Sequence, residues 1–329
     1  MQVSLVKSNS AVRFSVIIPL YNKAPYVEKA INSVLSQTFP DYELVIMDDG
    51  SKDDSYEVAQ KAIQDHKCCR LYKQKNAGVS MARNEAVALS QGDYLCFLDA
   101  DDWWAPSFLS EMSKLIEEFP DAGIYGTGYT IVNETKRKTR VSPIGVEKDF
   151  EKGYINYCQV YAKTLAMPLT SISVAIPRVV FDEMGGFPRG VKLGEDFLLW
   201  IHVALKYKVA LLNKPLAYYN QDVDAVNRGV GHLYPPQEHM LWNLTDLEPL
   251  EITNEDYKKL VDKLRVNGLL TYYVSSDYHT FAKKELAKVN WTDKELNRFG
   301  FYQLPRVLVK LFVDLRAIGS RVKQIIKNI

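Results

Sequence analysis

The sequence predicts an α/β fold in which a mostly parallel central sheet is flanked by helices, followed by a C-terminal helical extension. In the first half of the chain, short apolar runs rich in β-branched residues alternate with segments whose apolar residues recur at helical spacing. Strands and helices that alternate in this way form a parallel sheet covered on both faces. Beyond about Tyr234 the chain is more polar and its pattern is helical.

The first half supplies most of the elements of the expected sheet. Its strand-like runs are residues 14–19, 42–47, 70–73 and 94–98. Pro25 and Pro106 each open a helix, because proline fits the first helical turn. Ser51 and Asp54 have the spacing of a capping box for another helix. A further helix is expected within residues 76–90.

The second half continues this pattern less regularly. Strands are expected at residues 123–132, 171–176 and 209–219, helices at 154–165 and 195–205, and a basic turn at 135–140. Pro235, Pro236 and Pro249 indicate a boundary near residues 235–250. We therefore expect a main domain at residues 1–235, a helical extension at 236–300 and a basic amphipathic helix at 301–329.

The composition is that of an ordinary globular protein, with 47% hydrophobic and 25% charged residues. A net charge of +1 gives no overall field that would favour nucleic acid as a partner. The four cysteines show no Cys-x-x-Cys spacing, so neither a disulfide framework nor a zinc site is expected. Residues 1–13 lack the apolar core of a signal peptide, and no apolar run approaches the length of a membrane span. We expect a cytoplasmic protein.

The stretch Phe97–Asp102 places three carboxylates directly after an apolar strand. Burying such charges unpaired is costly, and a cation is the simplest partner. Alternation along an extended segment puts Asp99 and Asp101 on one side, and their oxygen ligands suit Mg²⁺ or Mn²⁺. The alternative is a solvated loop, or the N-cap of the helix after Trp104.

Polar groups also follow two other strands, at Pro19-Leu-Tyr-Asn22 and Asp48-Asp-Gly-Ser51. In open α/β sheets, ligands bind at the carboxyl ends of the strands. The three strand ends therefore predict one shared pocket, although each of them alone also reads as a turn or a cap.

These segments resemble, in order and spacing, the family 2 glycosyltransferases of GT-A fold. The likeness continues in Asn76-Ala-Gly-x-Ser-x-Ala-Arg-Asn84, Gly185-Gly-Phe187 and Gly194-Glu-Asp196. It covers about residues 12–220. It implies a GT-A nucleotide-sugar-binding fold for the main domain, and an enzyme that transfers a sugar from a nucleotide diphosphate donor to an acceptor hydroxyl with inversion at the anomeric carbon.

The resemblance also implies roles for single residues. The nucleotide-binding set is Pro19, Tyr21, Asn22, Asp49, Gly78, Arg83 and Asp99. Asp49 would hydrogen-bond the base, and uridine is favoured because a carboxylate can accept from a uracil imide N–H. Arg83 would lie near the diphosphate or ribose, with a surface ion pair as the alternative. The Asp-X-Asp motif would hold Mn²⁺ or Mg²⁺ through Asp101 and Asp99, helped by His232, whose alternative is a solvent-facing histidine.

A single inverting displacement needs one carboxylate as general base. Asp196 is the candidate and Glu195 the alternate, although acidic residues at a helix start also cap it and complement its dipole. The residues expected at the donor or acceptor sugar are Gly185, Gly186, Trp103 and Trp104. Glycines allow close approach of the backbone but also end helices, and tryptophans stack on sugars but more often form core.

Residues 301–329 carry six basic side chains against Asp314 and place their apolar residues mainly on one helical stripe. Such a segment reads as an anchor in the membrane interface, here at the inner face of the plasma membrane near a lipid-linked acceptor. Packing on the main domain or on a dimer mate is the alternative.

We therefore expect a metal-dependent glycosyltransferase of bacterial surface polysaccharide or glycan synthesis, with a glycan or lipid-linked acceptor. A sugar-nucleotide nucleotidyltransferase is the nearest competitor, but Pro19-Leu-Tyr-Asn22 stands where that class needs a glycine-rich, basic phosphate loop. A dinucleotide oxidoreductase is disfavoured because no Gly-x-Gly-x-x-Gly follows a strand. A non-catalytic nucleotide-sugar-binding protein is the remaining alternative.

Overall fold

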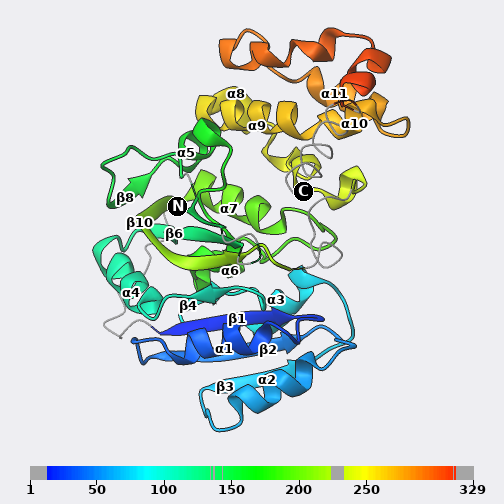
Figure 1. Cartoon of the computed structure of the whole chain (residues 1–329). Coiled ribbons are helices and arrows are strands. Elements are labelled where there is room, and N and C mark those ends of the chain that lie inside the picture. Colours follow the sequence, from blue (N-terminus) through cyan, green and yellow to red (C-terminus); the bar gives the residue numbers. More distant parts are fainter. Residues whose placement is uncertain are drawn as a thin grey trace. The chain divides into compact units, whose positions relative to one another are not determined.

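The computed structural model describes residues 13–133, 135, 138–142, 144–223, 233–313 and 315. By its internal contacts the chain divides into two compact units, Met1–Asp246 and Leu247–Ile329. The first unit combines a central sheet with helices and the second is helical, so the predicted fold class is confirmed (Figure 1). The finer division into a main domain, a helical extension and an amphipathic helix stays a prediction.

The strands of the first unit form one sheet. Their bounds are β1 Phe14–Leu20, β2 Tyr42–Asp48, β3 Cys69–Lys73, β4 Tyr94–Phe97, β5 Trp103–Trp104, β6 Ala122–Asn133, β7 Lys138–Val141, β8 Lys152–Ile155, β9 Val174–Pro177 and β10 Lys208–Asn220. Within the described residues, these ten strands follow the order β3-β2-β1-β4-β9-β6-β10-β5, with β7 beside β6 and β8 beside β10.

The N-terminal half of the sheet is parallel. β1 pairs with β2 and with β4, and β2 pairs with β3, all in the same direction. Leu20 pairs with Asp48 and Ile17 with Phe97, so the carboxyl ends of β1, β2 and β4 meet at one edge. β9 runs antiparallel to both β4 and β6, which makes the remaining half of the sheet mixed.

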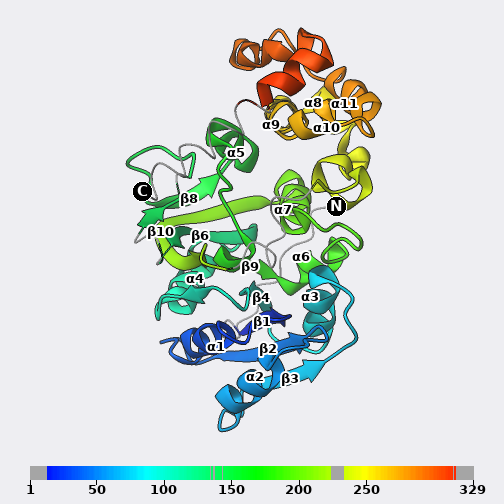
Figure 2. The ribbon, with the colours of Figure 1, turned by 45° about the vertical axis from the view of Figure 1, so that its right-hand side comes forward.

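Helices cover both faces of the sheet. They are α1 Val27–Leu35, α2 Ser55–Ile63, α3 Val79–Ala88, α4 Phe108–Glu118, α5 Tyr157–Thr164, α6 Arg178–Glu183 and α7 Glu195–Lys206. α1, α2 and α4 share a buried apolar cluster with Val16 and Ile18 of β1. On the other face, Phe97 of β4 packs against Phe181 of α6 and Trp200 of α7. Figure 2 shows α3, α6 and α7 following one another along this side.

The start of α2 differs from the prediction. The helix begins at Ser55 with Asp54 as its N-cap, and no side chain caps it. The Oγ of Ser51 instead accepts a hydrogen bond from the backbone N–H of Asn22 at 3.1 Å. The predicted capping box is therefore wrong, because this hydroxyl serves the turn after β1, a partner that local spacing does not reveal.

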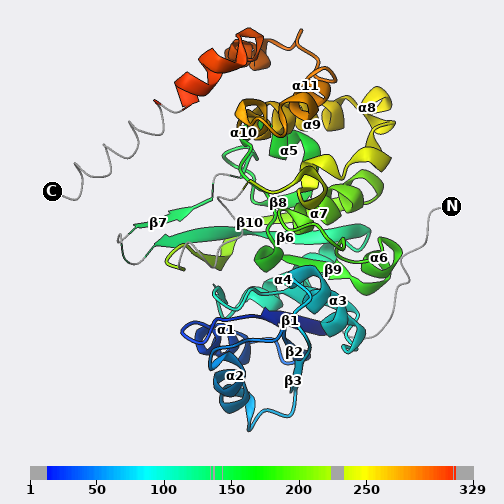
Figure 3. The same cartoon turned by 90° about the vertical axis from the view of Figure 1, so that its right-hand side faces the viewer.

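Three further segments also take a different form. The predicted turn at 135–140 contains the start of β7, which lies beside β6 (Figure 3). The predicted helix at 154–165 begins with the end of β8, and the predicted strand at 171–176 begins as the 3₁₀ turn Ser171–Ser173. β7 and β8 are strands because they pair with β6 and β10, respectively. This pairing satisfies backbone N–H and C=O groups through contacts between distant segments, which local sequence does not reveal.

The second unit is built from short α-helices. They include α8 Leu250–Thr253, α9 Glu255–Gly268, α10 Leu270–Val274 and α11 His279–Leu286. Arg265 of α9 binds both carboxylate oxygens of Glu251 at 2.7 Å and lies 3.4 Å from Glu285, so ion pairs hold these helices together. Within the part of the chain that the structure describes, none of the helices has the length and apolar character that crossing a bilayer requires.

Candidate active site

The carboxyl edge of the sheet opens into a cavity of about 890 Å³, a size typical of small-molecule sites. Its lining comes from the ends of β1, β2, β4 and β10, from α3, from residues 165–172 and from the first turn of α7. The polar groups that follow β1, β2 and β4 therefore meet in one place. The predicted site residues that line the cavity are Pro19, Tyr21, Asp49, Gly78, Arg83, Asp99, Asp101, Glu195 and Asp196.

Two carboxylates of the acidic run after β4 each form an ion pair with a basic side chain. Arg83 donates through Nη2 to Asp99 at 2.7 Å. The ammonium of Lys23 lies 2.6 Å from Oδ2 of Asp101, and these two side chains are only 14% and 16% exposed. Burial, together with the charge of Asp99, raises the pKa of Asp101 although Lys23 opposes the shift.

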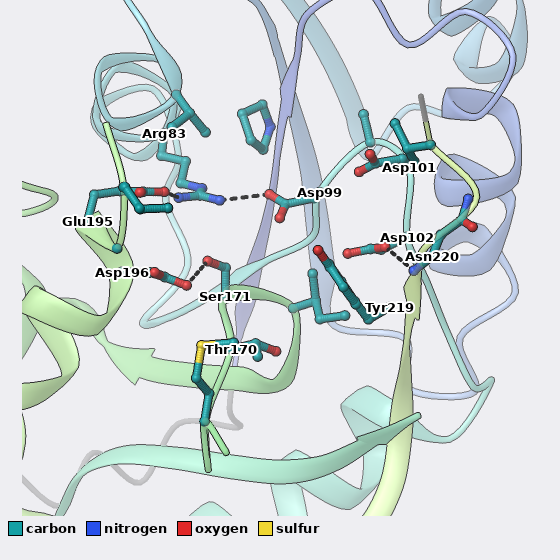
Figure 4. Close-up of a pocket in the computed structure, with 18 of the residues that line it drawn as sticks. Arg83, Asp99, Asp101, Asp102, Thr170, Ser171, Glu195, Asp196, Tyr219 and Asn220 are labelled. Carbon is teal, nitrogen blue, oxygen red and sulfur yellow. Dashed lines mark hydrogen bonds and ion pairs between the residues drawn. The ribbon is translucent and has the colours of Figure 1, made fainter. Parts of the chain in front are cut away.

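Asp102, the third carboxylate of the run, is 1% exposed. Its Oδ1 accepts a hydrogen bond from the backbone N–H of Asn220 at 2.7 Å (Figure 4), while Oδ2 has no hydrogen-bond partner among the described residues. Burial, and then the charges of Asp101 and Asp99, raise the pKa of Asp102 well above its ordinary value. The acidic run is therefore not the solvated loop that the sequence left as an alternative.

Arg83 of α3 joins the two acidic sides of the cavity. Besides Asp99, its guanidinium binds Glu195 through Nη1 at 2.8 Å (Figure 4). The guanidinium also lies 4.9 Å from the ring centre of Phe187. Burial alone would lower the pKa of Arg83, but the surrounding carboxylates raise it above its ordinary value. With 2% of its surface exposed, Arg83 belongs to a buried network and not to a surface ion pair.

Glu195 and Asp196 lie in the first turn of α7, directly after the N-cap residue Gly194. Asp196 accepts hydrogen bonds from Oγ of Ser171 at 2.8 Å and from the backbone N–H of Phe197 at 2.9 Å. Its partners are neutral, whereas Glu195 binds a guanidinium. Burial, and then the charge of Asp196, raise the pKa of Glu195 to about 7, and burial also raises the pKa of Asp196. Such a pair can accept a proton near neutral pH.

Asp49, which follows β2, holds the loop that leads into α3. Its Oδ1 accepts from Nε2 of Gln74 and from the N–H of Ala77, and its Oδ2 accepts from the N–H of Gly78, each at 2.8 Å. Gly78 has a φ of +91°, and an added Cβ would meet nothing within 4 Å, so the backbone conformation and not space calls for glycine there. Of the roughly four acceptor positions of a carboxylate, one remains for a ligand.

The described residues contain no group of three or more His, Cys, Asp or Glu side chains that could hold a metal ion. Asp99 and Asp101 nevertheless present two carboxylates to the cavity. Mg²⁺ commonly takes one or two carboxylates from the protein, and substrate phosphates and water complete its shell. The two residues therefore fit an ion that is shared with phosphates. His232, the third expected ligand, lies outside the described residues.

Five predicted site residues lie outside the lining of the cavity, although the structure describes all of them. These are Asn22, Trp103, Trp104, Gly185 and Gly186. Trp104 is buried, its Nε1 donates to the carbonyl of Ile172 at 2.6 Å, and its ring stacks on Phe108. Trp103 stacks on Tyr218 of β10. Both tryptophans therefore fasten β5 to its neighbours.

Gly185 and Gly186 form the end of α6. Both have positive φ, +79° and +77°, and their N–H groups donate to carbonyls of the preceding turn. An added Cβ on Gly186 would lie 2.7 Å from Oδ1 of Asn84, whereas one on Gly185 would meet nothing within 4 Å. Asn84 of α3 binds both the N–H and the carbonyl of Phe187 at 2.9 Å. The glycines thus let α6 end against α3.

The cavity also contains residues that the sequence did not single out. They are Lys23, Tyr129, Thr170, Ser171, Tyr219 and Asn220, among others. Lys23 directly follows the segment Pro19–Asn22. Its position as a basic residue next to a motif of the expected acidic pocket was the signal that could have identified it as a site residue. The remaining residues come from the mixed half of the sheet, and no local pattern marks their place at its edge.

Comparisons with known proteins agree with this fold. The sequence profile described as Glycosyl transferase family 2 matches residues 15–183. An uncharacterised glycosyltransferase of Rickettsia felis is 30% identical over 261 residues, which cover 78% of this chain and 40% of that protein. The glycosyltransferase GlyA of Streptococcus pneumoniae is 30% identical over 229 residues, which cover 67% of this chain and 31% of GlyA. The chain thus spans less than half the length of these relatives.

Among solved structures, residues 1–349 of S. aureus TarS in complex with UDP-GlcNAc align with a TM-score of 0.70 at 18% identity, covering 94% of this chain and 92% of that chain. The same part of TarS in complex with UDP aligns with a TM-score of 0.67 at 18% identity and equal coverage. These likenesses show a shared fold. Because the family profile extends over just over half of the 329 residues, the chain belongs to glycosyl transferase family 2.

Proposed function

We propose that the protein is a glycosyltransferase that moves a sugar, with inversion, from a nucleotide diphosphate sugar to an acceptor hydroxyl, and that the nucleotide is UDP. One observation carries the proposal. Arg83 binds Asp99, in the acidic run, and Glu195, which directly precedes the candidate base Asp196, so one buried guanidinium joins a carboxylate of the expected metal site to the helix turn that carries the base. Charge stabilisation at a departing diphosphate and proton removal from an acceptor are the two requirements of such a transfer.

Asp49 is the proposed partner of the nucleotide base. Its remaining acceptor position suits the imide N–H of uracil. Pro19 and Tyr21 line the same cavity, and Tyr21 is 41% exposed, so its aromatic ring is available for a base to stack on. The TarS structures with UDP-GlcNAc and UDP are examples of this fold with a uridine nucleotide.

In the proposed reaction, the acceptor oxygen attacks the anomeric carbon while the bond from that carbon to the β-phosphate oxygen breaks. The acceptor proton passes to the carboxylate of Asp196, and the bonding electrons leave with the nucleoside diphosphate. Attack on the face opposite the leaving group inverts the configuration. Ser171 and Phe197 orient Asp196 through neutral hydrogen bonds, whereas Glu195, the alternate base, is engaged by the guanidinium of Arg83.

Asp99 and Asp101 would hold Mn²⁺ or Mg²⁺. When bound, such an ion supplies Lewis-acid stabilisation of the charge that grows on the diphosphate. Titration calorimetry of UDP with and without Mn²⁺ tests this assignment. We expect Asp101→Ala to lose the Mn²⁺-dependent part of UDP binding, while the exposed Asp54→Ala keeps it. Equal Mn²⁺ dependence in the wild type and in Asp101→Ala would contradict a metal site at this residue.

Asp196→Asn tests the base. We expect the affinity for the donor to be retained and the transfer rate to fall by roughly 10²–10⁴-fold, because the amide cannot take the proton. Asp182→Asn, an exposed position on α6, is the matched control and should leave the rate unchanged. Unaffected turnover in Asp196→Asn would remove Asp196 from this role. A wild-type protein that binds donors but transfers none would indicate a non-catalytic nucleotide-sugar-binding protein.

The acceptor is proposed to be a glycan or a lipid-linked glycan, in bacterial surface polysaccharide or glycan synthesis. One part of the cavity lining is apolar and aromatic, with Tyr129, Met167, Phe197 and Tyr219. Aromatic faces stack on the C–H surfaces of sugars, which suits a carbohydrate acceptor. Product formation from oligosaccharide acceptors, compared with amino-acid and nucleoside hydroxyls, would test this class.

The C-terminal segment is proposed to place the enzyme on the inner face of the plasma membrane, in the cytoplasm. Its described part exposes a row of apolar side chains: Leu304, Val307, Leu308, Leu311, Phe312 and Leu315. Arg306 and Lys310 lie in the same stretch, and a basic apolar helix binds anionic lipid interfaces.

Deleting residues 301–329 tests the membrane assignment. We expect the shortened protein to lose binding to phosphatidylglycerol vesicles but to keep transfer to a soluble acceptor. Unchanged vesicle binding would contradict the assignment. A dimer that the deletion turns into a monomer would instead identify a second copy of the chain as the partner of this segment.

A further inference from the structure

Lys23 is a charged residue of the cavity to which the proposed reaction gives no role. Lys23 binds Oδ2 of Asp101, the carboxylate that we expect to hold the metal ion, at 2.6 Å. Both side chains are mostly buried, so water screens this pair less than it would a surface ion pair. An ammonium in this position competes with any cation for the same carboxylate.

The backbone of Lys23 is firmly held. Its N–H donates to Oγ of Ser55 at 2.7 Å, and the N–H of the preceding Asn22 donates to Oγ of Ser51 at 3.1 Å. Oδ1 of Asn22 accepts in turn from the N–H of Lys52 at 2.9 Å, and Asn22 has a φ of +50°. The turn after β1 is thus tied to the turn before α2. The Lys23 side chain therefore starts from a fixed point, and only its flexible stem is free to move.

The other two carboxylates of the acidic run have partners that are harder to displace. Asp99 binds Arg83, whose guanidinium is also held by Glu195 on its other side. Asp102 binds a backbone N–H. Among the described ion pairs of the run, the contact between Lys23 and Asp101 is the one in which a single flexible cation meets a single carboxylate.

We infer that Lys23 is the counter-ion of Asp101 in the donor-free protein, and that the divalent cation of the proposed reaction exchanges with it. The exchange keeps a positive charge at Asp101 throughout, so a largely buried carboxylate is never left unpaired. The released ammonium stays in the cavity on its fixed backbone, where it is available to the diphosphate of the donor as a point charge. The inference rests on the proposed metal-dependent function and deepens it.

This exchange couples the binding of the cation to that of the nucleotide. Without nucleotide, Lys23 competes with the cation and weakens its binding. A diphosphate draws the ammonium away from Asp101 and thereby relieves the competition, and by linkage the cation favours the nucleotide to the same degree. Removing the lysine should therefore change the affinities for cation and nucleotide in opposite directions.

Lys23→Met provides the test, because methionine has a similar length and no charge. Mn²⁺ binding is measured by electron paramagnetic resonance, with and without UDP, in the wild type, Lys23→Met, Lys23→Arg and Lys61→Met. We expect Lys23→Met to bind Mn²⁺ alone about tenfold more tightly than the wild type, since a competing unit charge is removed. We expect UDP to bind the Mn²⁺-loaded variant about tenfold more weakly, since its diphosphate loses a cation.

The controls behave differently on this view. Lys23→Arg retains a cation and Lys61→Met alters an exposed lysine of α2, so both should match the wild type. Mn²⁺ affinity in Lys23→Met that equals or falls below the wild-type value would overturn the inference, as would unchanged UDP affinity in the loaded variant. If Lys23→Met does not fold, Lys23→Gln is measured in the same way. If the wild type binds Mn²⁺ no better than Asp101→Ala, the proposed metal site itself fails.

Discussion

Arg83 and Glu195 stand 112 residues apart in the sequence and meet through a buried hydrogen bond of 2.8 Å between Nη1 and Oε1. Arg83 belongs to α3 and Glu195 to α7, so the contact joins two helices on the same face of the sheet. Since Arg83 also binds Asp99, one guanidinium sets the distance between the acidic run and the first turn of α7.

Replacing Arg83 by lysine keeps the charge and removes the planar fork. A single ammonium cannot reproduce both of its bonds, so one of the two carboxylates, the buried Glu195 or the partly exposed Asp99, loses its partner. We expect the free energy of unfolding to fall by about 2–4 kcal/mol in urea denaturation. Arg189→Lys changes an exposed arginine and should leave it unchanged. Equal stability of the two variants would show that the bridge does not hold the domain together.

The pH dependence of transfer should reveal the carboxylate pair. A base accepts a proton only when ionised, so kcat/KM falls as the pH drops through the pKa of the pair, which for Glu195 is raised to about 7. Glu195→Gln removes the negative charge next to Asp196, so Arg83 is then shared between Asp99 and Asp196 only. We therefore expect the acidic limb of the profile to move down by about one pH unit with activity retained. Activity lost at every pH would instead identify Glu195 as the base.

The same residue makes stability depend on pH. The pKa of Glu195 is higher in the folded protein than the ordinary value of 4.5, so the folded state holds this proton more tightly. The stabilisation is fully present below pH 4.5 and is lost as the pH rises through about 7. Urea denaturation at pH 5 and pH 8 should show a smaller decline in Glu195→Gln than in the wild type. An equal decline would contradict the raised pKa.

Asp49→Asn should loosen the loop before α3. An amide offers one acceptor oxygen, and its NH₂ group would face the N–H of either Ala77 or Gly78. We expect the free energy of unfolding to fall by about 1–3 kcal/mol and UDP affinity to fall with it. Asp54→Asn, at an exposed N-cap without a side-chain bond, should change neither quantity. Unaltered UDP affinity in Asp49→Asn would separate this loop from nucleotide binding.

The two glycines at the end of α6 provide an internal comparison. Gly185→Ala meets only the strain of a positive φ, about 1–2 kcal/mol. Gly186→Ala adds a Cβ 2.7 Å from Oδ1 of Asn84 and should displace that side chain from Phe187. We expect Gly186→Ala to be the more destabilising of the two by about 1–3 kcal/mol in urea denaturation. Equal losses would mean that Asn84 moves aside without cost.

The periodic patterns of the sequence placed β1, β2, β4 and the helices between them, because burial on one or both faces leaves a local, repeating record in the chain. The rule that parallel strands end at one edge then brought Tyr21, Asp49 and Asp99 into one expected pocket. Ser51 departs from the local pattern, since a hydroxyl at a capping position also suits a distant backbone donor, here the N–H of Asn22. Trp104 could belong either to the core or to the acceptor cleft, because tryptophan is common in both places and the residue type alone does not distinguish them.

The periodic patterns and the strand-end rule do not reveal which basic side chain pairs with each carboxylate. Lys23 and Asp101 are 78 residues apart, and Arg83 and Glu195 are 112 apart. Residue spacing along the chain does not reveal these contacts. They depend on the mixed half of the sheet, where β9 runs antiparallel to β4 and β6 and where α7 begins at the edge at which the parallel strands end. The local sequence thus identified the acidic residues of the site, whereas long-range packing determined which cation each of them binds.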